Sequence, residues 1–327
     1  MSSASRGSKR LYPADSLSSP RFTGPYTFAR LPQTRELEGV DALFIGIPFD
    51  CGVVFRPGAR FGPGAVRQAS LLLRLYNPRL KVRPFDVLNV ADYSDIEVVP
   101  GSIDLTYRKI SDALKTIVEG GVTPVVCGGD HSITLPVLRE VSKRFGRLAL
   151  IHVDAHLDTV DQHFSQKYTH GTVVKRALEE KLIDPHRSVH VGIRGSLFSE
   201  EELEEAKSLS FTVLTMQEIE DRGLDSVCEE IKKKAGDGPA YLTFDIDVCD
   251  PSCAPGTGTP EVGGLTSREA LKLVDSLESL DIVGFDLVEV SPPYDHGEIT
   301  ALLAANIIYE FLSLTAHKRI CRKERLS

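Results

Sequence analysis

Four short segments of the sequence are unusually rich in side chains that can bind metal ions or move protons. They are Gly128-Gly129-Asp130-His131, Asp154-Ala155-His156-Leu157-Asp158, Asp245-Ile246-Asp247 and Glu289. Each follows an apolar run typical of a buried strand, and alternate residues of an extended segment point to the same face. Asp154, His156 and Asp158 are therefore expected to face one point. Asp245 and Asp247 are expected to face the same point. Because carboxylates packed this closely repel one another unless cations neutralise them, the pattern predicts a metal cluster.

The predicted metal ligands are two imidazoles and four carboxylates. They are His131, Asp154, His156, Asp158, Asp245 and Asp247. This set is too large for one tetrahedral zinc ion and fits two divalent ions that share aspartates. An oxygen-rich set without a thiolate favours manganese, with nickel, iron and cobalt as alternatives. Cys249 and Cys253 lie close together, but no second cysteine pair or nearby histidine in the sequence completes a zinc site with them. We therefore predict two Mn²⁺ ions per chain, with Ni²⁺ as the main alternative.

The charge of such a centre indicates the kind of substrate it accepts. Two divalent ions, four carboxylates and a bridging hydroxide sum to about −1, and Glu289 adds another negative charge. A small cationic substrate is therefore expected. Because divalent ions lower the pKa of water, the expected reaction is hydrolytic attack on an electron-poor carbon.

The segments that position these residues alternate between short β-rich runs and amphipathic helical patterns. Strands are predicted at 42–47, 122–126, 148–153, 188–193, 211–214, 241–246 and 282–287, and helices at 103–118, 135–144, 173–181, 200–207, 225–234, 267–277 and 300–314. Ser199 with Glu202, and Thr266 with Glu269, have the spacing of capping boxes, and Pro63 fits a first helical position. Repeated strand–helix–strand units predict an α/β fold of three layers, α/β/α, around a parallel doubly wound sheet. In such folds ligands bind at the carboxyl ends of the strands.

Length and composition exclude several classes of protein. The 327 residues carry a formal net charge of −8, 42% of them are hydrophobic, and the six cysteines are scattered. This acidic balance predicts no nucleic-acid partner. No uninterrupted apolar run approaches the roughly 18 residues of a membrane helix, so no membrane span is expected. The cysteine pattern and the lack of a signal peptide predict reduced thiols and a cytoplasmic location.

The domain organisation is expected to be simple. Residues 1–35 are rich in Ser, Arg and Pro and predict an N-terminal arm, with an organelle-targeting segment as the alternative. Residues 36–327 contain no repeat or Pro/Gly-rich linker and predict a single catalytic domain.

Longer motifs around these residues resemble the ureohydrolase family of arginase, agmatinase and guanidino-acid hydrolases. They are residues 128–132 (GGDHS), 154–158 (DAHLD), 243–247 (TFDID) with Asp250-Pro251, 255–261 (PGTGTPE) and 289–295 (EVSPPYD). The resemblance runs from about Asp41 to Phe311. Residues 56–63 (RPGARFGP) and 170–172 (HGT) resemble the agmatinase branch more than arginase. The resemblance implies an arginase-like fold, a binuclear manganese centre, release of urea from a guanidinium group, and a homo-oligomer, a trimer or hexamer.

The resemblance also implies a role for each motif residue. His131 and Asp158 would bind one ion, His156 and Asp247 would bind the other, and Asp154 and Asp245 would bridge the two. Glu289 would hold the guanidinium, whose paired N–H donors match a carboxylate. His170 would carry a proton to the departing amine. The remaining histidines match no motif ligand and are expected to be structural or surface residues. They are His152, His163, His186, His190, His296 and His317.

The substrate's tail is less well specified by the sequence. Residues 159–169 lack the Asn- and Ser-bearing loop by which arginase binds the α-carboxylate of arginine, so agmatine is the expected substrate. Glu298 is a candidate partner for an amine tail, and Arg194 is one for a carboxylate tail. The alternatives are a guanidinobutyrase or guanidinopropionase, a nickel-dependent guanidine hydrolase, a mono-zinc deacetylase of related architecture, and a catalytically silent paralogue with a structural or activating role. All six ligand positions are filled, which argues against a silent paralogue.

Overall fold

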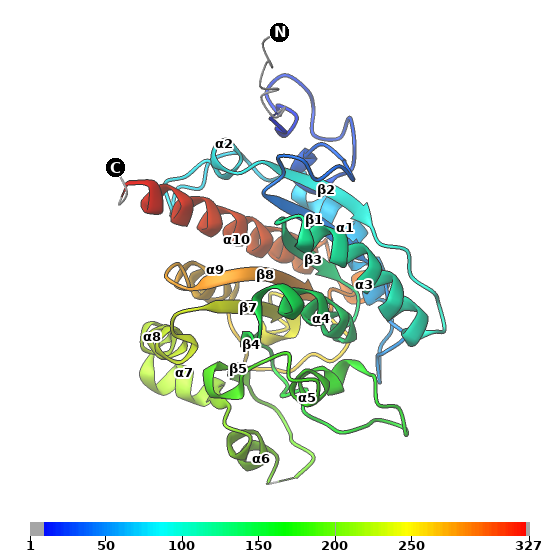
Figure 1. The fold of residues 1–327 in the computed structure, drawn as a ribbon, viewed down its shortest axis with the longest axis vertical. Coiled ribbons are helices and arrows are strands. Elements are labelled where there is room, and N and C mark those ends of the chain that lie inside the picture. The colour runs from blue at the N-terminus through cyan, green and yellow to red at the C-terminus, as the bar shows by residue number, and fades with distance from the viewer. Residues whose placement is uncertain (1–9, 200, 325–327) are drawn as a thin grey trace.

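The sheet of the computed structural model has eight strands, and every neighbouring pair is parallel. The structure describes residues 10–199 and 201–324. The strands are β1 (Ala42–Ile47), β2 (Val90–Asp95), β3 (Thr123–Gly128), β4 (Ala149–Val153), β5 (Val189–Ile193), β6 (Thr212–Thr215), β7 (Pro239–Asp245) and β8 (Asp281–Val288). Their order is β2-β1-β3-β8-β7-β4-β5-β6 (Figure 1). The predicted doubly wound parallel sheet is confirmed.

Helices cover both faces of the sheet, which gives the three predicted layers (Figure 1). The α-helices are α1 (Gly62–Ser70), α2 (Pro84–Val87), α3 (Ile103–Glu119), α4 (Thr134–Phe145), α5 (Val173–Glu179), α6 (Glu202–Ser208), α7 (Met216–Arg222), α8 (Leu224–Ala235), α9 (Ser267–Asp275) and α10 (Ile299–Glu324). Helices α3, α4 and α5 pack on one apolar cluster, and α1, α8, α9 and α10 pack on another. Val125 and Cys127 of β3 join one cluster and Val126 joins the other, because successive strand residues point to opposite faces.

The seven predicted strands and seven predicted helices are present within a few residues, apart from the much longer α10, but several elements were missed and one predicted cap is absent. The edge strand β2 was missed because its sequence, VADYSD, is polar. Helices α2 and α7 were also missed, and α1 was indicated only by Pro63 near its start. Thr266 and Glu269 form the predicted capping box. The box predicted for Ser199 and Glu202 is not formed, because α6 starts at Glu202 and Ser199 accepts a hydrogen bond from the Glu201 amide instead. The predicted start of that helix at position 200 lies outside the described residues.

Helix α10 is longer than predicted, with 26 residues. Its length and composition alone would suit a membrane span, but 78% of the relevant window is buried inside the protein. It packs against α1, α2 and α9. It is therefore the core helix of one outer layer.

Part of the predicted N-terminal arm belongs to the core. The Phe28 ring is fully buried and stacks on Phe44 of β1, with 4.6 Å between ring centroids. The Phe28 amide donates to Asp92 of β2, whose carboxylate also accepts two hydrogen bonds from Arg67. These contacts fasten residues around Phe28 to the β1–β2 edge of the sheet.

Candidate metal centre and substrate pocket

The predicted site residues follow four strands that are consecutive in the sheet. His131 follows β3, Glu289 follows β8, Asp247 follows β7 and Asp154 follows β4. Strands β3 and β4 are successive in the chain, but β8 and β7 lie between them in the order β3-β8-β7-β4. Parallel strands have their carboxyl ends at the same edge of a sheet. Because β7 and β8, which come later in the sequence, lie between β3 and β4, all four segments meet at the middle of that edge.

The local backbone differs from the extended conformation that we expected. Residues 246–248 form a 3₁₀ turn, and Asp158 has a positive φ of 53°. The Asp154 Oδ1 atom accepts the His156 amide at 2.6 Å, and the Asp245 Oδ1 atom accepts the Asp247 amide at 2.9 Å. In both segments the aspartate thus hydrogen-bonds to the backbone two residues on, as in Asx turns. The side chains converge as predicted. The cause is these turns and not the alternation of residues along an extended strand.

One group of ligand atoms surrounds the Nδ1 atom of His131. This atom lies 3.0 Å from Oδ2 of Asp154, 3.2 Å from Oδ2 of Asp158 and 3.2 Å from Oδ2 of Asp245. His131 and Asp154 are each only 1% exposed. These atoms are close enough to bind one common ion.

A second group surrounds the Nδ1 atom of His156. It lies 3.1 Å from Oδ2 of Asp247 and 3.4 Å from Oδ1 of Asp154. Asp154 belongs to both groups and presents a different oxygen to each. This arrangement is the one that a bridging carboxylate requires. Bridging by Asp245 stays a prediction, since its close contact is with the His131 group.

The electrostatics of the cluster fit a pair of cations. Burial and the neighbouring carboxylates of Asp247 and Asp154 raise the pKa of Asp245 well above its usual value. Nδ1 of His131 and Oδ2 of Asp154 are buried and make no hydrogen bond to any described residue. Divalent ions would neutralise the carboxylates and satisfy these atoms. The residues present therefore fit two divalent ions.

A buried hydrogen-bond network fixes the other nitrogen of His131. Its Nε2 atom lies 2.8 Å from Thr243 Oγ1, and this hydroxyl donates to Oδ1 of Asp286 at 2.5 Å. Asp286 also accepts hydrogen bonds from the hydroxyls of Tyr241 and Thr134. Such partners orient a metal-binding imidazole and fix its tautomer. The network thus leaves Nδ1 of His131 directed at the predicted metal position.

Glu289 and His170, the predicted substrate-binding and proton-carrying residues, contact each other. Glu289 Oε1 lies 2.9 Å from Nδ1 of His170 and accepts the His131 amide at 2.9 Å. Glu289 is 1% exposed and has a φ of 64°, a strained conformation for a non-glycine residue. Burial disfavours protonation of His170, but the Glu289 carboxylate outweighs burial and raises its pKa to about 9. In the neutral form Nε2 accepts the Val54 amide at 3.2 Å, so protonation must open that contact.

This pKa predicts how the rate depends on pH. If protonated His170 supplies the proton for the departing amine, kcat/KM falls as pH rises through about 9, because His170 then loses that proton. The pH profile of His170→Asn should lack this limb. His186→Asn, at an exposed histidine away from the site, should keep it. If kcat/KM of His170→Asn still falls as pH rises through about 9, the fall is caused by a group other than His170.

A cavity of about 270 Å³ opens above the ligands and is lined by residues from both groups. Among the described residues, Arg194 is the one Lys or Arg side chain that lines it. Its guanidinium donates to six backbone carbonyls, among them those of Asp247 and Glu261. Arg194 is therefore not available for a substrate carboxylate, and Glu298 is not among the lining residues. Apart from the predicted metal ligands, the carboxylates that line the cavity are those of Glu202 and Glu261.

Two residues of the site were missed by the sequence argument. His152, expected to be structural, lies within the first ligand group, with Nε2 3.1 Å from Oδ2 of Asp154. Its position two residues before Asp154, on the same strand face, was the available signal. Asp130 is fully buried, and burial together with the Glu289 charge raises its pKa to about 7.

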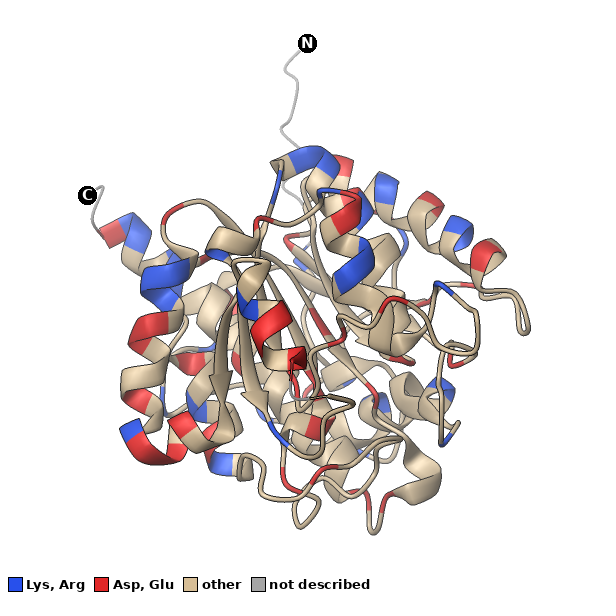
Figure 2. Cartoon of the chain, turned by 90° about the horizontal axis from the view of Figure 1, so that it is seen from below, with Lys and Arg blue, Asp and Glu red and all other residues tan. Residues whose placement is uncertain are grey.

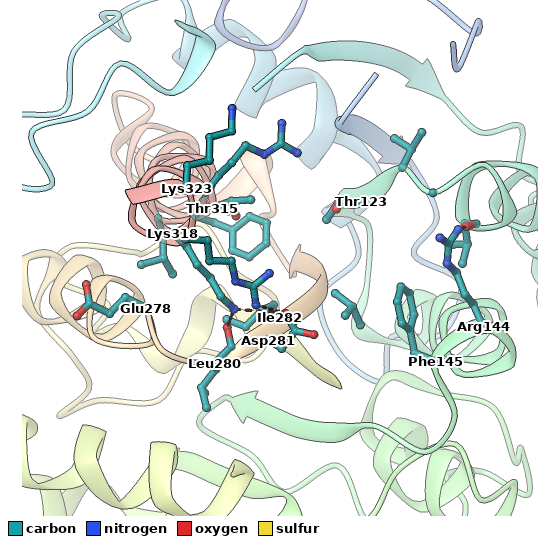
Figure 3. Close-up of a pocket in the computed structure, with 18 residues that line it drawn as sticks. Thr123, Arg144, Phe145, Glu278, Leu280, Asp281, Ile282, Thr315, Lys318 and Lys323 are labelled. Atoms are coloured by element: carbon teal, nitrogen blue, oxygen red, sulfur yellow. Dashed lines mark hydrogen bonds and ion pairs between the residues drawn. The ribbon is translucent and has the colours of Figure 1, made fainter. Parts of the chain in front are cut away.

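A larger groove lies at the opposite edge of the sheet, shown in Figure 3. Thr123, at the start of β3, and Asp281, at the start of β8, line it. Its Lys318 and Arg322 side chains contact Asp281. Because the predicted metal ligands follow the carboxyl ends of the strands, this groove is not part of their site. Figure 2 shows acidic and basic residues interspersed along the outer helices, as is usual for solvent-facing sides.

Comparison with known proteins finds relatives that match most of the chain. The model of the Arginase family matches residues 40–313. A guanidinobutyrase of Pseudomonas aeruginosa is 44% identical over 90% of this chain and 93% of its own length. A mitochondrial agmatinase of Gallus gallus is 43% identical over 89% of this chain and 86% of its own length. The solved structure of proclavaminate amidinohydrolase from Streptomyces clavuligerus superposes with a TM-score of 0.88 at 40% identity, covering 92% of this chain and all of that one.

Proposed function

The chain belongs to the arginase family of hydrolases that act on guanidino compounds, and from that premise we propose that its substrate is agmatine, cleaved to putrescine and urea. The family depends on a binuclear metal centre, and the described His and Asp cluster fits a metal site. We further propose that the two ions are Mn²⁺, because the ligand set is rich in carboxylate oxygen.

The charge of the cavity lining supports a substrate with a cationic tail. Glu202 and Glu261 line the cavity beyond the metal ligands, and the guanidinium of Arg194 is occupied by backbone carbonyls. A tail ammonium would meet carboxylates there. A tail carboxylate would meet no free Lys or Arg among the described lining residues, so a guanidino acid is disfavoured.

The residues divide the chemical work between them. When bound, the ions would supply Lewis acidity and an activated water. The carboxylate of Glu289 would accept the N–H donors of the guanidinium and hold its carbon over the centre. His170, in contact with the same carboxylate, holds a proton that it can deliver to the departing amine nitrogen.

Urea release from a panel of substrates tests the proposal. Mn²⁺-loaded and Ni²⁺-loaded protein would be assayed with agmatine, arginine, guanidinobutyrate, guanidinopropionate and guanidine, and we expect agmatine to have the highest kcat/KM. Glu261→Gln should raise KM for agmatine by about two- to fivefold, because a solvent-accessible ion pair is worth about 0.2 to 1 kcal/mol, and should not raise KM for guanidinobutyrate. A preference for a guanidino acid, or urea release from guanidine with Ni²⁺ alone, would overturn the assignment.

A further inference from the structure

Two buried histidines outside the predicted ligand set contact each other, and one of them also lies close to Asp154. His152 of β4 and His190 of β5 are paired residues in the register of the two parallel strands. Both are 0% exposed. Their Nδ1 atoms lie 2.9 Å apart, and the Nε2 atom of His152 lies 3.1 Å from Oδ2 of Asp154.

The distances determine which nitrogen atoms carry hydrogen. Nε2 of His152 and Oδ2 of Asp154 lie 3.1 Å apart, although neither atom makes a hydrogen bond to a described residue. A lone pair on Nε2 so close to an anionic oxygen in a buried site would be repulsive, so we assign the hydrogen to Nε2. In a neutral imidazole the other nitrogen is then an acceptor. With both imidazoles neutral, the 2.9 Å contact between the Nδ1 atoms then has His190 as the donor.

The rings are held in place by packing. The His152 ring stacks on His131, with 5.2 Å between centroids and 22° between planes. The His190 ring lies against Phe211 at 4.7 Å. Neither imidazole can turn without disturbing a buried neighbour, so both rings keep their orientation.

We propose that His190 and His152 form a donor relay that holds the Asp154 carboxylate in its bridging orientation. Asp154 is the one described residue in both ligand groups, so its orientation affects both ions. Oδ2 accepts no hydrogen bond from a described residue in the structure, so the relay requires it to accept from His152 when the ions are bound. A carboxylate oxygen has two lone pairs, which allows it to face an ion and accept from His152 at once. His152 and His190 are positioning residues that act through Asp154. The inference relies on the binuclear centre of the proposed function and not on the identity of the substrate.

Metal binding to the full-length apoprotein tests the relay without an activity assay. Mn²⁺ affinity would be measured by the loss of the free-ion EPR signal, and formation of the pair by the spectrum of two coupled ions. His152→Leu should weaken binding about 10- to 100-fold, the usual cost of losing a partner of a metal ligand. His152→Gln should recover most of this loss, because its amide can donate near the position of Nε2. His190→Leu should weaken binding less, and His190→Asn, which keeps a polar atom near Nδ1, should resemble the wild type.

Control variants separate the relay from direct metal ligation by His152 and from an effect of histidine removal in general. His186→Leu removes an exposed histidine and should leave affinity unchanged. If His152→Gln binds as weakly as His152→Leu, His152 is itself a ligand and the relay is wrong. Wild-type affinity in both leucine variants would also overturn it. Should His152→Leu fail to fold, the two His190 variants decide the same question. An unexpected substrate preference would contradict the proposed function without altering these affinities.

Discussion

Asp247→Asn should lose one of the two metal ions and nearly all urea release. Asp247 Oδ2 lies 3.1 Å from Nδ1 of His156, and Oδ1 accepts the Ala155 amide at 3.2 Å. An asparagine can keep the Ala155 contact but cannot supply the negative charge that the ion requires. A catalytic metal ion contributes several kcal/mol to transition-state stabilisation, and about 1.4 kcal/mol corresponds to a factor of ten. We therefore expect kcat to fall about 100-fold or more.

Elemental analysis and urea release measured on the same samples check this prediction. The wild type should hold two ions per chain and the variant about one at limiting Mn²⁺. Asp281→Asn is the matched control, because Asp281 forms ion pairs with Lys318 and Arg322 at the opposite edge of the sheet. Full metal content and full activity in Asp247→Asn would remove Asp247 from the ligand set.

Glu289→Gln should keep both ions and lower kcat/KM about 10- to 100-fold. The glutamine oxygen can still accept the His131 amide and the His170 Nδ1–H, which Oε1 contacts at 2.9 Å in each case. The fold and the metal ligands are therefore preserved. What is lost is one negative partner of the guanidinium, and a hydrogen bond to a charged group is worth roughly 1.5 to 3 kcal/mol.

The pH profile of the same variant gives a second readout. Without the Glu289 charge, the pKa of His170 should move down from about 9, because the carboxylate is what raises it against burial. The alkaline limb of kcat/KM should shift to lower pH. Loss of metal with unchanged activity per bound pair of ions would instead make Glu289 a ligand or a structural acid.

The sequence alone was enough to predict the kind of chemistry proposed for this protein. Each cluster of Asp, His and Glu follows a β-rich apolar run, and a parallel α/β fold places strand ends at one edge. From these two facts the ligand types, their number and a cationic substrate could be predicted. Helix and strand positions followed because local periodicity and caps such as Thr266 with Glu269 are encoded in short segments.

Only the tertiary structure decided how these groups are arranged. The insertion of β8 and β7 between β3 and β4 is a non-local choice, and no local pattern encodes it. The pairing of His152 with His190 depends on the register of two separate strands. The occupation of the Arg194 guanidinium by carbonyls of residues 192, 247–249, 261 and 262 depends on how distant loops meet. Composition and spacing fix which atoms can bind or donate, whereas packing decides which of them are left free to do so.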